Sequence, residues 1–228
     1  MSLPTIRPIS DFEVPFDFPL NPYITVYNKV TSRYVASDAR TEFSAAWIAL
    51  AYRFTAITEL DNKFTQSIRR AGDAPVQPER FIQDQALFDF FVNGLAAIES
   101  LCYGSFALGN LLAPVGFPFT TEREKRSVTP EATRDAFIRT FPGSLTNSLR
   151  VLCSSTEYDQ WRSARNLLAH RIAPGRHTFA GVGSDAPNPA SIMMTLQIPL
   201  DLNTTSVRRS WLTTTVLALL TAVNDLPM

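Results

Sequence analysis

The sequence predicts an all-α protein that carries a small β-hairpin, and three observations lead to this fold class. Apolar residues recur at spacings of three and four over long stretches between residues 38 and 226, as on the buried face of a helix. Proline and glycine separate these stretches. Residues 176–202 differ, because strand-forming residues there stand between Gly, Asp, Asn and Pro. We therefore expect an up-and-down helical bundle over residues 38–228, with a hairpin inserted at about residues 176–202.

The N-terminal 37 residues are rich in proline. Proline lacks a backbone N–H and is excluded from the interiors of helices and sheets. This composition predicts an extended arm over residues 1–37 that lies against the helical domain, with a short strand over residues 23–30 as an alternative. The prolines are Pro4, Pro8, Pro15, Pro19 and Pro22.

The helices of the bundle are bounded by capping and breaking residues. The first begins with Ser37 or Asp38 as its N-cap and ends at Gly72. The second begins near Pro78 and ends at residue 112, and a loop is expected at residues 113–128. A third helix has Thr129 as its cap. Further helices are expected at residues 144–152, 155–172 and 204–225.

Charge and composition exclude some function classes. The 228 residues are 45% hydrophobic, which is enough for a core, and the formal net charge is zero. A protein that coats nucleic acid by bulk charge is therefore not expected, although a local basic site is compatible with this balance. Nearly all cations are arginines, which suit bidentate phosphate contacts, but genome base composition explains their excess equally well.

Cysteine usage and hydropathy indicate a cytoplasmic protein without a metal or cofactor. Cys102 and Cys153 lie in apolar segments and have neither a CxxC partner nor a nearby histidine, so we expect reduced core residues. The longest apolar stretch, residues 95–112, is interrupted by Glu99 and other polar residues. A charge within a lipid span is costly, so no membrane helix is predicted.

The helix expected at residues 155–172 carries one of the two histidines of the chain. Residues at i and i+4 share a helix face, so Arg162, Asn166 and His170 are expected to form one polar stripe. Arg165 lies nearer the apolar side, but its long side chain can turn toward that stripe. A cation, an amide and an imidazole are suited to phosphate chemistry, because the cation binds anionic oxygens and the imidazole transfers a proton near neutral pH.

The segment Arg165-Asn166-Leu167-Leu168-Ala169-His170 resembles the Arg-x4-6-His signature of the HEPN superfamily. This resemblance implies a helical bundle that forms a homodimer, with the motif helices of two protomers facing each other. It also implies metal-independent cleavage of RNA. On this interpretation the catalytic residues are Arg165, Asn166 and His170, and Arg162 and Arg171 bind substrate.

The leading functional expectation is thus a metal-independent endoribonuclease of HEPN type, with a toxin or defence role as one context. Its expected partners are RNA or a nucleotide, a second copy of the chain, and an antitoxin or another protein. The main alternative is a non-catalytic HEPN-like module that binds nucleotide, RNA or protein. A third interpretation is an unrelated all-α protein.

His170 and Arg165 could have structural roles instead of catalytic ones. His170 near a helix C-terminus interacts favourably with the helix dipole. Arg165 could pair with Glu99, because a carboxylate in an apolar stretch requires a partner.

Overall fold

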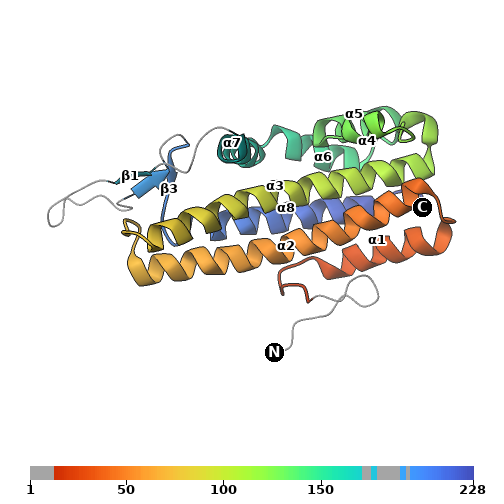
Figure 1. Cartoon of the computed structure of the whole chain (residues 1–228). Helices are drawn as coiled ribbons and strands as arrows, with labels where there is room; N and C mark the ends of the chain where they lie inside the picture. Colours follow the sequence, from red (N-terminus) through yellow and green to blue (C-terminus); the bar gives the residue numbers. More distant parts are fainter. Residues whose placement is uncertain (1–12, 171–175, 179–190, 194–195) are drawn as a thin grey trace. The chain divides into compact units, whose positions relative to one another are not determined.

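The computed structural model describes residues 13–170, 176–178, 191–193 and 196–228. In these residues the protein is mostly helical and carries one three-stranded antiparallel sheet, which confirms the predicted fold class at this level (Figure 1).

Six helices lie where the sequence predicts them. Gly72, with φ of +73°, follows the first of them in the left-handed conformation that glycine adopts readily. The Thr129 hydroxyl accepts a hydrogen bond from Ala132 N at 3.1 Å and so caps α5. The six are α2 (Asp38–Ala71), α3 (Glu79–Leu112), α5 (Pro130–Thr140), α6 (Ser144–Ser154), α7 (Thr156–His170) and α8 (Ser206–Asn224).

The expectation of an extended arm or a strand near the N-terminus is wrong for residues 20–33, which form helix α1 (Leu20–Arg33). Pro22 is the third residue of α1, in the first turn, where an N–H has no intrahelical acceptor. Tyr23, Val26 and Val30 are buried and share one helix face. A spacing of three and four residues is that of a buried helix face, whereas a strand with one buried face alternates at every second residue.

The loop expected at residues 113–128 contains two short helices. A 3-10 turn, η1, covers Pro114–Gly116, and helix α4 covers Glu122–Arg126. Thr121 and Glu124 form a capping box, in which the Thr121 hydroxyl accepts from Glu124 N and the Glu124 carboxylate accepts from Thr121 N. The sequence signal for α4 is therefore the Thr-x-x-Glu spacing.

The predicted β addition is present as three short antiparallel strands. They are β1 (Arg176–Thr178), β2 (Ser191–Met193) and β3 (Ile198–Pro199), in the order β1-β2-β3. Arg176 holds β1 to α3, because its Nε donates to Asp84 Oδ1 at 2.8 Å and its Nη1 to Gln83 Oε1 at 2.7 Å.

The described residues divide into two compact units. The first contains the residues up to Thr55, Ala96–Ser155 and Thr213–Met228, and the second contains Ala56–Leu95 and Thr156–Leu212. Helices α2, α3 and α8 contribute residues to both units.

Aromatic packing holds α1 to α2 in the first unit. Tyr23 Oη donates to Trp47 O at 3.0 Å, and Trp47 Nε1 donates to Tyr23 O at 3.1 Å. The Trp47 ring stacks on Phe43 with centroids 4.6 Å apart. The Tyr23 hydroxyl and the Trp47 indole N–H each have a hydrogen-bond partner. Burial of these two rings therefore stabilises the fold without leaving an unsatisfied polar group.

Helix α3 is long and apolar enough to cross a membrane by length and composition alone, and it is the one such helix in the described part of the chain. Its most apolar window has 61% of its residues buried inside the protein. This burial is what a core helix shows.

Candidate functional site

Helix α7 (Thr156–His170) carries the predicted site residues, and its orientation follows from its apolar side. Trp161, Ala164 and Leu168 are buried. Trp161 stacks on Phe90 of α3, with ring centroids 5.0 Å apart. Trp161 and Leu168 therefore face the core.

The polar side of α7 faces solvent at the two stripe positions whose side chains are described. Arg162 and Asn166 are exposed. The Arg162 Nη2 atom donates to Asp159 Oδ1 at 2.7 Å, and its guanidinium lies 5.6 Å from the Tyr158 ring centroid. Exposed pairs of this kind contribute about 0–1 kcal/mol, so a stronger anion could displace Asp159 at small cost.

The other residues predicted for the site or as partners of it lie on α7, on α3 or outside the described residues. Arg165 is half-buried on α7 and Glu99 is half-buried on α3. His170 is the last residue of α7, and its side chain lies outside the described residues. Arg171 lies wholly outside them. The motif backbone from Arg165 to His170 is therefore helical, and Arg162 and Asn166 lie on one exposed face of α7.

A cavity of about 300 Å³ opens beside α7 in the second unit. Its walls combine hydroxyl, amide and carboxylate side chains from α7 with aliphatic side chains around β3, and they comprise Thr156, Asp159, Gln160, Ser163, Leu196 and Ile198. Sequence reasoning missed this cavity. The signal in α7 is the spacing of Thr156, Gln160 and Ser163, but no pattern predicts which strand residues complete the wall.

Gln160 of this cavity wall is bonded to Arg208 of α8. Its Nη2 atom donates to Gln160 Oε1 at 3.4 Å, and its Nη1 donates to Thr204 O at 2.6 Å. The guanidinium lies 5.8 Å from the Phe91 ring centroid. Burial lowers the pKa of the Arg208 guanidinium, and the nearby Asp201 carboxylate opposes that shift. The charge of Arg208 is thus held largely away from water.

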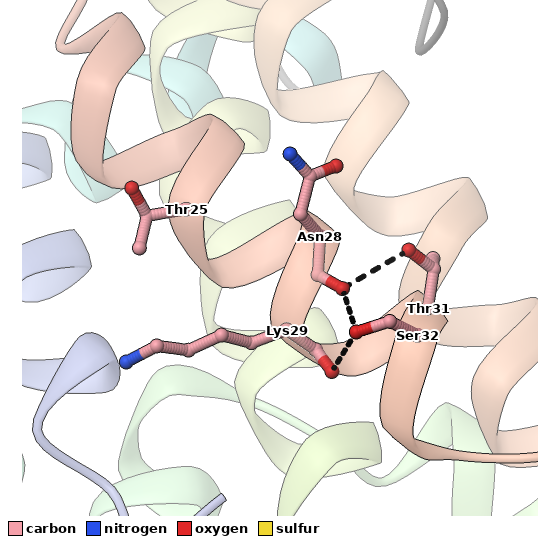
Figure 2. Close-up of a pocket in the computed structure, with 5 residues that line it drawn as sticks. All are labelled: Thr25, Asn28, Lys29, Thr31 and Ser32. Carbon is pink, nitrogen blue, oxygen red and sulfur yellow. Dashed lines mark hydrogen bonds between the residues drawn. The ribbon is translucent and has the colours of Figure 1, made fainter.

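In two other depressions some of the polar groups are already engaged. Figure 2 shows the first, of about 610 Å³, on α1. There Ser32 Oγ donates to Asn28 O at 2.6 Å, and Lys29 Nζ donates to Asn224 Oδ1 at 2.8 Å. In the second, beside α2, Arg70 pairs with Glu79 at 2.7 Å.

Among the residues that the structure describes, no three His, Cys, Asp or Glu side chains gather as a metal site would require. No family profile, no curated protein and no solved structure matches this chain.

Proposed function

We propose that this protein is a metal-independent endoribonuclease of HEPN type, with Arg165, Asn166 and His170 as its catalytic residues. The observation that supports the proposal is the orientation of α7. Trp161 and Leu168 are buried, while Arg162 and Asn166 are exposed. A substrate therefore has access to the polar side of the motif helix.

The reaction follows from the residue types. The 2′-hydroxyl of RNA attacks the adjacent phosphorus, the P–O5′ bond breaks, and a 2′,3′-cyclic phosphate and a 5′-hydroxyl result. His170 takes the 2′-hydroxyl proton as base, and a second imidazole protonates the departing O5′ as acid. Arg165 stabilises the added negative charge on the phosphoryl oxygens, and Asn166 orients them.

A homodimer supplies the second imidazole, since one histidine cannot act as base and acid in the same step. In an isologous interface the same residues of two protomers face each other, so α7 and its partner copy would bring two His170 residues together. Arg162 and Arg171 then bind phosphates of the RNA on either side of the cleaved bond.

The direct experiment is cleavage of a mixed RNA pool by the purified chain in excess EDTA. Cleavage should persist, a DNA pool of the same sequences should remain intact, and His170→Ala should lose at least about 100-fold in rate. His177→Ala is the matched control, because His177 is the other histidine of the chain and lies exposed on β1.

Two outcomes would count against the proposal. Equal cleavage by the wild-type chain and His170→Ala would assign the activity to another site. RNA binding without cleavage by the wild-type chain would favour the non-catalytic binding module instead.

A further inference from the structure

One wall residue of the cavity between α7 and β3, Gln160, is bonded to the cation Arg208, whose nearby carboxylate, Asp201, makes no hydrogen bond to it in the described residues. The hydrogen bonds of Arg208 in the described residues go to the Thr204 carbonyl and the Gln160 amide oxygen, neither of which is a carboxylate. Its Nε is buried and makes no hydrogen bond in that part of the chain. A buried cation is costly unless an anion compensates it.

The bond between Arg208 and Gln160 is the one that joins Arg208 to a residue of the cavity wall. At 3.4 Å it lies beyond the usual 2.7–3.2 Å range for such bonds and is therefore weak. An anion in the cavity could replace the Gln160 oxygen as the acceptor for Nη2, which would turn the Gln160 amide N–H toward the same anion. Displacing this bond costs little, and a charge-assisted bond is about twice as strong as a neutral one.

The other walls fit a particular kind of anion. Ser163 supplies a hydroxyl donor, whereas the Thr156 hydroxyl already donates to Glu157 Oε2 at 3.2 Å, and Leu196 and Ile198 supply an aliphatic side. The one acidic wall residue, Asp159, is paired with Arg162 at 2.7 Å, which reduces its repulsion. Guanidinium, amide and hydroxyl donors together match the three terminal oxygens of a phosphate monoester better than the two of a carboxylate.

We propose that this cavity binds a small phosphate monoester, with Arg208, Gln160 and Ser163 on its phosphate and Leu196 and Ile198 on its apolar substituent. The volume of about 300 Å³ is at the lower end of the range for small-molecule sites. The proposal rests on the cavity and on Arg208, and it is independent of the proposed ribonuclease activity.

The test is isothermal titration calorimetry of the full chain with phenyl phosphate, inorganic phosphate and phenol as probes. Phenyl phosphate should bind at least about tenfold more tightly than inorganic phosphate or phenol, because only phenyl phosphate contacts both the polar and the aliphatic wall residues. No binding of phenyl phosphate at millimolar concentration would overturn the proposal. Inorganic phosphate binding as tightly as phenyl phosphate would overturn the monoester assignment.

Two variants locate the site. Arg208→Gln should weaken phenyl phosphate binding at least about tenfold, the scale of one lost charge-assisted bond. Ser163→Asp, at an exposed position that should leave folding intact, should weaken it similarly through charge repulsion. Arg69→Gln is the control, because Arg69 is exposed on α2 away from the cavity wall. Unchanged binding in Ser163→Asp, with circular dichroism as in the wild-type chain, would overturn the location.

Discussion

The indole ring of Trp161 lies directly against the backbone of Gly94. A Cβ atom on Gly94 would come within 1.8 Å of Trp161 Cζ3 and 2.1 Å of Cη2. The ring also contacts Phe90 and Phe91, with centroid separations of 5.0 and 5.2 Å. Trp161 therefore packs helix α7, which carries the motif, against α3. This contact requires a glycine at position 94 of α3, because any side chain there would overlap the indole ring.

We expect Gly94→Ala to destabilise the protein by about 2 kcal/mol. Overpacking a core costs about 1–3 kcal/mol, and occasionally more, and the better helix propensity of alanine returns only about 1 kcal/mol. Urea denaturation gives the free energy of unfolding. Gly143→Ala is the control, since a Cβ there meets no atom within 4 Å, and it should stay within about 1 kcal/mol of the wild-type chain. Equal effects of the two variants would contradict the close contact.

Asp61 of α2 is mostly buried and accepts hydrogen bonds from Arg209 of α8 and from Thr205, which directly precedes α8. Arg209 Nη1 donates to its Oδ2 at 3.2 Å, and Thr205 Oγ1 donates to its Oδ1 at 2.6 Å. Asp61→Ala should lower the free energy of unfolding by about 3 kcal/mol, because it removes a mostly buried carboxylate to which the largely buried Arg209 donates. The double variant Asp61→Leu with Arg209→Leu should recover most of that loss in the same urea experiment. A double variant no more stable than Asp61→Ala would contradict this account.

Glu42 links α2 to α3 and α4, since it accepts from Lys125 Nζ at 2.8 Å and from Tyr103 Oη at 3.0 Å. The bond from Lys125 holds the pKa of Glu42 below its ordinary value, and the same bond raises the pKa of Lys125. Glu42 therefore stabilises the fold above its unfolded pKa of about 4.3 and loses this effect as the pH falls through its folded pKa. Lys125 stabilises below its unfolded pKa of about 10.4 and loses the effect as the pH rises through its folded pKa.

Thermal denaturation across pH tests this pair. The melting temperature of Glu42→Gln should lie below that of the wild-type chain between about pH 5 and pH 10, and the two should converge near pH 3. Glu122→Gln is the control, because that carboxylate is 76% exposed and lies 3.7 Å from Lys125. It should show a smaller difference. A difference between Glu42→Gln and the wild-type chain that is constant down to pH 3 would contradict the ionic origin.

The dimer required by the proposed mechanism has its own test. Sedimentation velocity at tens of micromolar should show a dimer. Asn166→Glu, on the exposed side of α7, should shift the chain toward the monomer through like-charge repulsion across the symmetric interface. A strict monomer of the wild-type chain at that concentration would contradict the two-histidine mechanism.

Long helices with clear boundaries were predictable from the sequence, and irregular segments were not. The ends of α2 and α5 follow from Gly72 and Thr129, whose effects are local. Helix α1 was missed because the proline content outweighed the spacing of Tyr23, Val26 and Val30. Its helical state depends on burial against Trp47, which is 24 residues away in the chain.

The candidate site was predictable only along α7. Helical periodicity places Arg162 and Asn166 together on the exposed side, because both belong to one helix. The cavity wall needs Leu196 and Ile198, and its cation Arg208 comes from α8. No local pattern encodes such long-range pairings. The Arg-x4-His spacing itself carries the catalytic proposal, and only chemistry can test it.

The measurement that tests the central claim most directly is the chemical identity of the RNA ends after cleavage. A single RNA oligonucleotide is incubated with the chain in EDTA, and its products are weighed by mass spectrometry beside those from His170→Ala. The account predicts 2′,3′-cyclic phosphate and 5′-hydroxyl ends from the wild-type chain, at a rate at least about 100-fold above that of the variant. Products with 3′-hydroxyl and 5′-phosphate ends, or equal yields from the two proteins, would contradict it.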